Sequence, residues 1–292
     1  MKSLKNILIK VLIMSGLFLG GVIPAIASDI ATTKILAEKG DTAAQSNLGL
    51  MYYRGNGVRQ DYSKAFDLFQ KAANQGFAAA QNNLGVMYES GNGVRQDYSK
   101  AFDLYRKSAN QGDAEAQNNL GFMYEKGNGV RQDYSKAFDL FQKAANQGFA
   151  AAQNNLGVMY ESGNGVRQDY SKAFDLYRKS ANQGYAEAQN NLGFMYHHGN
   201  GVRQNYSKAF DLFQKAANQE LIPAQRNLGV MYKSGNGVRQ DYSKAFDLFQ
   251  KAANQGFAAA QNNLGVMYES GNGVRQDYSK AFDLYRKSAN QG

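Results

Sequence analysis

The chain has 292 residues, with no cysteine, no tryptophan, two histidines and a formal net charge of +9. Without cysteine it can form neither a disulfide nor a thiolate metal site, and two histidines leave little material for metal or general-base chemistry. The positive charge is spread along the chain and forms no basic block, which argues against nucleic acid as a partner. The composition therefore predicts neither a metal site nor a cofactor.

Residues 1–27 have the three parts of a secretory signal peptide. A positive start is followed by an apolar stretch over residues 11–23 and by Ala25-Ile26-Ala27, a small-x-small cleavage sequence. The apolar stretch is shorter than the ~20 residues of a membrane-spanning helix, so we expect cleavage after Ala27 rather than a retained anchor. The expected location is the periplasm of a Gram-negative bacterium or the outside of the cell, with no transmembrane segment. The charges at the start are Lys2, Lys5 and Lys10, and their removal takes three from +9 and leaves +6.

The rest of the chain is an internal repeat. The sequence Gly-Asn-Gly-Val-Arg-Gln occurs seven times, each start 36 residues after the last. A period of this size without a β-rich pattern predicts an all-α solenoid of helix–loop–helix units. Residues 28–40 resemble a shortened second helix, which we expect to cap the first unit. The seven units are 41–76, 77–112, 113–148, 149–184, 185–220, 221–256 and 257–292, of which 77–112, 149–184 and 257–292 are identical.

Each unit contains the pattern of a first helix. In the first unit Ala44, Leu48, Met51 and Tyr52 recur at helical spacing and form one apolar face. Gly49 lies inside this helix, where glycine costs about 1 kcal/mol relative to alanine, so we expect it to allow a close approach by a neighbouring element.

The loop between the two helices of a unit has a characteristic residue at each end. Gly55 ends the first helix, because glycine tolerates the left-handed conformation of a C-terminal turn. Asp61 is placed to cap the second helix by accepting hydrogen bonds from backbone N–H groups. Ala65, Phe66 and Phe69 then form part of a broad apolar face.

These sequences resemble a known repeat family. Ala-Gln-x-Asn-Leu-Gly-x-Met-Tyr, followed by Gly-x-Gly-Val-x-Gln-Asp-Tyr-x-Lys-Ala-Phe, is similar to the Sel-one-like repeat (SLR), a relative of the tetratricopeptide repeat, throughout residues 41–292. The resemblance implies a right-handed superhelix of antiparallel helix pairs and an adaptor or scaffold role in bacterial envelopes and signalling. Some periplasmic members neutralise toxic enzymes. A secreted, cysteine-rich subfamily is linked to penicillin binding and β-lactamase activity, but this chain has no cysteine.

Two adjacent polar positions on each first helix are the candidate binding residues. Together with Gln45 and its equivalents they form an uncharged ladder, and amides can hydrogen-bond a peptide or a glycan. In tetratricopeptide domains an asparagine of the inner helix grips peptides; the alternative here is a structural hydrogen bond to the backbone of the next helix or a plain solvated face. The candidates are Asn47, Asn82, Asn83, Asn118, Asn119, Asn154, Asn155, Asn190, Asn191, Arg226, Asn227, Asn262 and Asn263.

Three further features stand out. His197 and His198 lie at the end of a first helix, where adjacent side chains diverge and are expected to be exposed variation rather than a metal site. Residues 220–226 break the repeat and predict a local change of curvature between the fifth and sixth units. An arginine in every loop could meet a polyanion, but a solvated loop is the favoured interpretation. These arginines are Arg59, Arg95, Arg131, Arg167, Arg203, Arg239 and Arg275.

The sequence as a whole favours binding over catalysis. No nucleophile–base, paired-carboxylate or phosphate-loop pattern occurs, and active sites are normally singular whereas these polar residues repeat. We expect an exported, non-enzymatic scaffold that binds a protein or peptide of the envelope, including a toxic effector that it neutralises, or a cell-wall glycan or peptide. The alternative is an enzyme of the cysteine-rich type that acts on cell walls or β-lactams.

The last unit carries an expectation of its own. The chain stops on Gly292 without a further helix, although solenoids usually need a capping element. We expect this end to be covered by a partner or another copy, or the chain to be a fragment or a product of repeat contraction. Phe282, Leu284 and Tyr285 lie on the apolar face of the last helix, so end-to-end self-association is expected.

Overall fold

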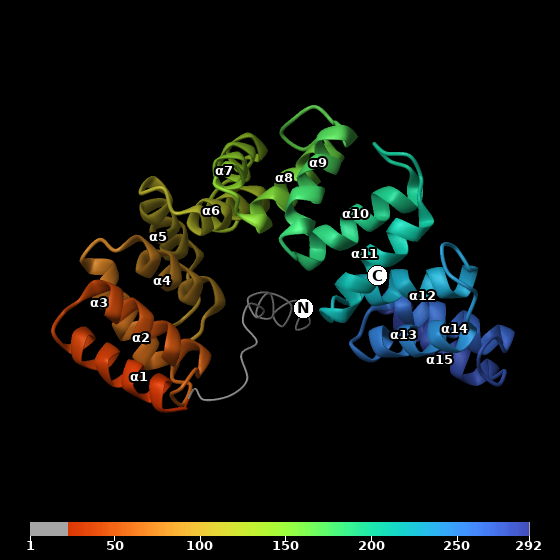
Figure 1. Cartoon of the computed structure of the whole chain (residues 1–292), viewed down its shortest axis with the longest axis horizontal. Helices are drawn as coiled ribbons and strands as arrows, with labels where there is room; N and C mark the ends of the chain where they lie inside the picture. The colour runs from red at the N-terminus through yellow and green to blue at the C-terminus, as the bar shows by residue number, and fades with distance from the viewer. Residues whose placement is uncertain (1–22, 292) are drawn as a thin grey trace. The chain divides into compact units, whose positions relative to one another are not determined.

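The computed structural model describes residues 23–291, which contain fifteen α-helices and no strand. The chain divides into two units, up to Phe149 and from Ala150, and each is described by itself. Figure 1 shows the helices of both units in chain order. The first unit contains α1 (Ile23–Glu38), α2 (Thr42–Arg54), α3 (Tyr62–Asn74), α4 (Ala78–Ser90), α5 (Tyr98–Asn110), α6 (Ala114–Lys126) and α7 (Tyr134–Asn146). The second contains α8 (Ala150–Ser162), α9 (Tyr170–Asn182), α10 (Ala186–His198), α11 (Tyr206–Asn218), α12 (Ile222–Ser234), α13 (Tyr242–Asn254), α14 (Ala258–Ser270) and α15 (Tyr278–Ala289).

From α2 onward the helices form pairs, one pair in each repeat. Within each unit, the first helix of a repeat packs on its own second helix, and that helix packs on the first helix of the next repeat. This consecutive packing of short helices confirms the predicted all-α solenoid. Among the described residues, no helix is both long enough and apolar enough to cross a bilayer.

The caps that set the helix bounds follow the sequence pattern. Gly55 ends α2 in the left-handed conformation, with φ of 75°, and its N–H donates to the Met51 carbonyl. Asp61 precedes α3, and its carboxylate accepts a hydrogen bond from the Lys64 backbone N–H at 3.1 Å. A backbone N–H that lacks an acceptor at the start of a helix costs free energy, so the recurring cap fixes where each second helix begins.

The core of a repeat lies between its two helices and the next first helix. Phe69 of α3 is buried and packs with Leu84 and Met87 of α4. The predicted close approach at Gly49 is made by an aromatic ring, because a Cβ there would lie 2.8 Å from the Phe69 ring. Glycine is therefore required in the middle of the first helix by the ring that fills the repeat.

Two versions of this core occur, with phenylalanine or tyrosine at the ring position; they alternate over the first five repeats. Repeats with a buried tyrosine at the ring position pair its hydroxyl with a glutamate at the end of the first helix, as Tyr105 does with Glu89 at 2.6 Å. The same repeats carry a serine whose hydroxyl donates to a backbone carbonyl, as Ser108 does to Ala78 at 2.8 Å. The tyrosine–glutamate pair recurs as Tyr177–Glu161 and Tyr285–Glu269. Repeats with phenylalanine at the ring position carry Tyr53, His197 or Lys233 at the glutamate position, except the third repeat, which keeps Glu125.

The helix α1 lies against the first repeat. Its Ala37 is buried with Ala44 and Leu48 of α2. The predicted cleavage site after Ala27 lies within α1, which begins at Ile23. Residues 1–22 of the predicted signal peptide lie outside the described residues.

Candidate partner-binding surface

The glutamines of the expected polar ladder are structural. Gln81 is buried, and its Nε2 donates to the Ala73 carbonyl at the end of the preceding second helix, at 3.3 Å. Its Oε1 accepts a hydrogen bond from Gln111 of its own repeat at 2.8 Å. The expectation that Gln45 and its equivalents lie on an accessible face was therefore wrong, because the ends of two second helices cover them. The buried members are Gln45, Gln81, Gln117, Gln153, Gln189, Gln225 and Gln261.

The asparagines at the next two positions connect successive repeats. Asn119 of α6 donates its Nδ2 to the Oδ1 of Asn82 on α4, at 3.0 Å. The same contact, from the second asparagine of one repeat to the first asparagine of the repeat before it, joins Asn191 to Asn154 at 3.0 Å and Asn227 to Asn190 at 2.9 Å. These bonds join side chains, unlike the hydrogen bond to the next helix's backbone that the sequence raised as an alternative. We call this row of linked side chains the amide ladder.

The ladder is partly exposed. Among the candidates Asn82 and Asn154 are buried, and Ser46, which stands at the same position in the first repeat, is buried too. Asn47 and Asn262 are exposed. A buried amide that hydrogen-bonds the next side chain of the ladder fixes the orientation of that side chain. The remaining donor and acceptor atoms of the ladder are therefore held in a fixed geometry. The half-buried candidates are Asn83, Asn118, Asn119, Asn155, Asn190, Asn191, Arg226, Asn227 and Asn263.

The ladder is interrupted at the sixth repeat. Arg226 occupies the position of Asn82 and Asn190, and a guanidinium group has no acceptor atom. Asn263 of the next repeat stands where Asn119 and Asn227 stand, and its buried Nδ2 has no hydrogen-bond partner. The Nε of Arg226 is also buried without a partner, while its Nη1 donates to the Oδ1 of Asn227 at 3.1 Å. Burial lowers the pKa of Arg226.

The backbone passes the divergent junction without a change in its hydrogen bonds. Leu221 donates its N–H to the Ala216 carbonyl at 3.2 Å, as Phe77 does to Ala72 at the first junction. Glu220 takes the left-handed conformation with φ of 63°, which the other junctions assign to glycine. Pro223 falls in the first turn of α12, where its missing N–H does no harm. These bonds do not test the expected change of curvature between the fifth and sixth units, which stays a prediction.

Two half-buried carboxylates near the ladder were not foreseen. Glu115 and Glu187 lie in the first turns of α6 and α10, where the equivalent residue of the identical repeats is alanine. Burial raises the pKa of Glu115, and the nearby Asn82 side chain offsets part of the rise. Burial also raises the pKa of Glu187, whose buried Oε2 has no partner. An acidic residue in a first helical turn is ordinarily a solvated one that favours the helix dipole, so only the packing of repeats reveals the burial.

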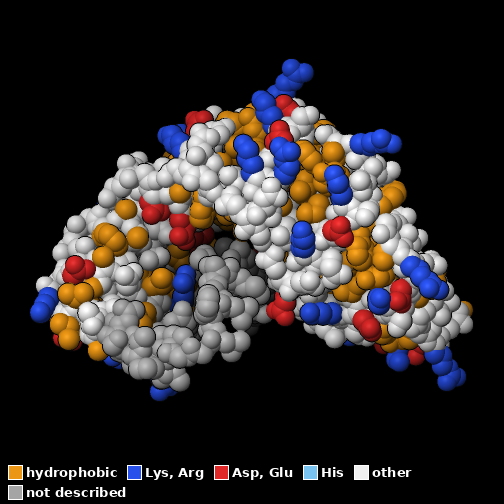
Figure 2. Space-filling view, in the orientation of Figure 1, with side chains coloured by type: hydrophobic (Ala, Val, Ile, Leu, Met, Phe, Trp, Pro, Cys, Tyr) orange, Lys and Arg blue, Asp and Glu red, His pale blue; other side chains and the backbone are white. Residues whose placement is uncertain are grey.

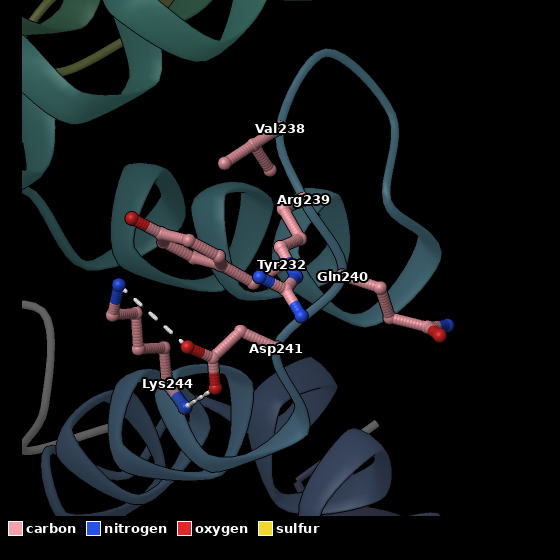
Figure 3. A pocket seen from close by; sticks show the side chains of 6 residues that line it. All are labelled: Tyr232, Val238, Arg239, Gln240, Asp241 and Lys244. Atoms are coloured by element: carbon pink, nitrogen blue, oxygen red, sulfur yellow. Dashed lines mark hydrogen bonds and ion pairs between the residues drawn. The ribbon is translucent and has the colours of Figure 1, made fainter.

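The loop side of a repeat has a shallow hollow. In the sixth repeat it measures about 450 Å³ and lies between Tyr232 and the loop that leads to Asp241 (Figure 3). Lys244 lies 5.2 Å from the centre of the Tyr232 ring and 3.6 Å from the Asp241 carboxylate. Asp241 also accepts the Lys244 backbone N–H, which lowers its pKa. The second repeat has the same hollow, of about 420 Å³, so this is a feature of the repeat's own packing.

The charged residues of the surface are dispersed. The arginines of the seven loops, represented in Figure 3 by Arg239, are all exposed. On the face drawn in Figure 2, basic side chains stand singly with acidic side chains among them. Exposed charges in such a mixture contribute little specificity.

The two histidines pack on aromatic rings. The His198 ring lies 4.1 Å from the Phe194 ring, and the His197 ring lies 5.1 Å from that of Tyr206. His197 is half-buried rather than exposed, which corrects the expectation for that residue; burial lowers its pKa. Within residues 23–291, no group of three or more histidine, aspartate or glutamate side chains could hold a metal ion.

Comparison with known proteins establishes the family. The Sel1 repeat model matches seven times, over residues 42–77, 78–113, 114–149, 150–185, 186–221, 222–257 and 258–292. The chain belongs to the Sel1 repeat family. Its units recur without a gap over residues 42–292, and the resemblance first drawn from the repeated sequence is confirmed.

Two solved structures are similar over most of this Sel1 repeat chain. A protective antigen of uropathogenic Escherichia coli with an SLR fold is 40% identical, with a TM-score of 0.70, over 90% of this chain and 56% of its own. A Sel1 repeat protein from Oxalobacter formigenes is 35% identical, with a TM-score of 0.66, over 92% of this chain and 78% of its own. The chain thus spans 56% of the length of the Escherichia coli structure. A comparison with curated protein sequences gave no match.

Proposed function

We propose that this Sel1 repeat protein is an exported, non-enzymatic scaffold that binds a protein or peptide of the bacterial envelope. The observation that carries the proposal is the amide ladder. It places amide donors and acceptors at regular intervals on successive first helices, and Asn119, Asn191 and Asn227 are each held by a bond to the preceding repeat. Amides satisfy peptide N–H and C=O groups equally well and are not screened by salt.

Affinity capture from envelope extracts tests the binding. The purified protein is compared with a variant that truncates the two exposed candidates, Asn47→Ala and Asn262→Ala, which leaves the three inter-repeat bonds in place. A control variant truncates two loop arginines, Arg59→Ala and Arg239→Ala. We expect a specific partner that the first variant recovers less well than the control. Recovery of general chaperones alone would remove the basis of the proposal, whereas recovery of a toxic enzyme would define the partner as an effector.

Two further measurements test export and the absence of catalysis. Amino-terminal sequencing of protein from the periplasm should begin at Ser28, and protein retained in the cytoplasm with an intact start would contradict export. Incubation with a chromogenic β-lactam and with peptidoglycan fragments should give no turnover. Turnover that disappears when the repeated serines are changed to alanine would favour the enzymatic alternative.

A further inference from the structure

Two ladder side chains of the sixth and seventh repeats, Arg226 and Asn263, each have a buried N–H donor without an acceptor, as does the adjacent Gln225. In the repeats before them, the second asparagine donates to the first asparagine of the preceding repeat, as Asn191 does to Asn154. Asn263 has no such acceptor, because the position it faces is held by Arg226. The Nδ2 of Asn263 and the Nε of Arg226 are both buried and unpartnered. An unpaired buried donor costs about 1–3 kcal/mol, so a molecule that supplies an acceptor would be stabilised here.

The arginine is arranged for a planar acceptor. Its Nη1 is used by Asn227, whose own Nδ2 donates to Asn190 at 2.9 Å, so the guanidinium is anchored to the ladder at one corner. The opposite edge of the guanidinium, formed by Nε and Nη2, makes no hydrogen bond or ion pair with the described residues. Two parallel N–H groups on one edge of a guanidinium match the two oxygens of a carboxylate.

The charge of the site favours an anion over a neutral carbonyl group. Burial is the cause that lowers the pKa of Arg226, with no carboxylate contributing, and no ion pair of Arg226 is found in residues 23–291. A half-buried cation without a counter-ion is costly, and a carboxylate would offset that cost while accepting from Asn263. Nε is buried whereas Nη2 is not, so an entering carboxylate meets Nη2 first and reaches Nε as the guanidinium turns.

We propose that Arg226 and Asn263 form a binding site for a carboxylate group of the protein or peptide partner. The inference rests on the proposed binding function and adds the chemistry of one contact. The amide ladder supplies neutral contacts along the repeats, and Arg226 supplies a single charged one. Because no other repeat has an arginine at this position, the site occurs once and would fix the register of a bound chain on an otherwise repetitive surface.

The test follows the ¹H–¹⁵N resonance of the Arg226 Nε–H in the purified protein, assigned by its loss in the variant Arg226→Asn. Three probes are titrated at constant ionic strength: N-acetylglycine for a C-terminal carboxylate, N-acetylglutamic acid amide for a side-chain carboxylate, and N-acetylglycinamide as the neutral control. We expect a saturable shift with the carboxylates and none with the neutral amide. The probe that binds more tightly shows whether the site takes a C-terminal or a side-chain carboxylate of the partner.

Variants separate this site from general anion binding. Arg226→Asn restores the residue of the neighbouring repeats and gives Asn263 an acceptor, so it should fold and lose carboxylate binding, measured by calorimetry. Asn263→Ala should weaken binding about tenfold, the equivalent of one hydrogen bond to a charged group. Arg239→Asn, which changes an exposed loop arginine of the same repeat, should have no effect. Equal binding by Arg226→Asn, or no saturable shift with either carboxylate, would overturn the proposal.

Failure of this inference is distinguishable from failure of the proposed function. If the wild-type protein and Arg226→Asn capture the same envelope partner equally well, the carboxylate contact is wrong and the scaffold stands. If carboxylates bind at Arg226 but neither protein captures a partner, the site stands and the scaffold is wrong.

Discussion

At the scale of single residues, the tyrosine and glutamate pairs show how a buried polar group is matched to a partner within its own repeat. The Tyr105 ring is fully buried, and its hydroxyl donates to Glu89 at 2.6 Å. Burial is the main cause that raises the pKa of Tyr105 well above its ordinary value, and the nearby Glu89 carboxylate adds to it. The hydroxyl therefore stays protonated and remains a donor.

Removal of the Tyr105 hydroxyl should leave the half-buried Glu89 carboxylate without its donor. We expect Tyr105→Phe to cost about 1–3 kcal/mol, seen as a lower urea midpoint by circular dichroism. Tyr285→Phe removes the same bond where the tyrosine is partly exposed, and should cost less. Restoration of the midpoint by the double change Tyr105→Phe with Glu89→Ala would support the reason given. Equal effects at positions 105 and 285 would contradict it.

The buried Glu115 predicts a dependence of stability on pH. Burial raises its pKa above the ordinary 4.5, so the folded protein holds this proton more tightly than the unfolded chain does. The contribution of Glu115 to stability is therefore greatest below pH 4.5 and is lost as the pH rises through the folded-state pKa.

Glu115→Gln should accordingly raise the thermal midpoint at pH 7, and its advantage over the wild type should shrink as the pH falls through the folded-state pKa toward the ordinary value of 4.5. The exposed Glu38 provides a matched control, since Glu38→Gln removes the same charge without a burial effect. An advantage of Glu115→Gln that does not vary with pH would show that packing, rather than ionisation, is responsible.

At the scale of the helix, the caps and the glycine positions decide where each element begins, ends and touches its neighbour. The second-helix caps were readable from sequence because aspartate before a helix and glycine after one act within a few residues. The glycine inside the first helix was readable as a close approach. That the approaching group is the ring of the same repeat, Phe69 at Gly49, depends on how the two helices pack.

Gly157 in α8 provides a test of this close approach. A Cβ there would lie 2.7 Å from the Tyr177 ring, which is fully buried. We expect Gly157→Ala to destabilise by about 1–3 kcal/mol, because overpacking outweighs the gain of about 1 kcal/mol in helix propensity. Val158→Ala, on the adjacent exposed position, should be neutral or slightly stabilising. A stabilising Gly157→Ala would mean that the ring yields freely.

The contacts between repeats could not be predicted from the pattern of one helix. Helical spacing places Gln45 beside the asparagines, yet it is buried between the ends of α1 and α3. The partner of Asn119 lies 37 residues away in the preceding repeat, a distance set by the stacking of repeats. Arg226 was visible as a departure from the repeat. Its two consequences are an Asn263 side chain without an acceptor and a guanidinium edge without a partner. Neither could be predicted without the positions of the neighbouring helices.

At the scale of the molecule, the exposed last helix leads to a prediction about association. Phe282 and Tyr278 of α15 are 64% and 66% exposed, whereas Phe102 of the identical second repeat is half-buried. Such an apolar surface favours association. We therefore expect self-association to increase with concentration in light scattering, and to be reduced by Phe282→Ser. A monomer at all concentrations would contradict the expectation.

The repetition of whole units allows deletions that leave no foreign junction. Residues 77–112 and 149–184 are identical, so deletion of 77–148 joins Gly76 to a copy of the repeat that normally follows it. Deletion of 77–112 removes fewer residues but joins the first repeat to the third, so that Glu115 meets Ser46 in place of Asn82. In a solenoid, stability is roughly a sum over units and their interfaces.

We therefore expect the 77–148 deletion, although it removes two repeats, to destabilise the remaining repeats less than the 77–112 deletion does. We expect the 77–148 deletion to keep the helical circular dichroism per residue of the full chain. We expect the 77–112 deletion to have the lower thermal midpoint of the two, although its product keeps one repeat more, because its new interface lacks the Asn82 side chain that offsets part of the cost of burying the Glu115 charge. Adding Glu115→Gln to that shorter deletion should recover part of the difference, since it removes the unpartnered buried charge. Loss of helical structure in the 77–148 deletion would refute the modular solenoid, and equal midpoints would show that the junction between repeats does not depend on these side chains.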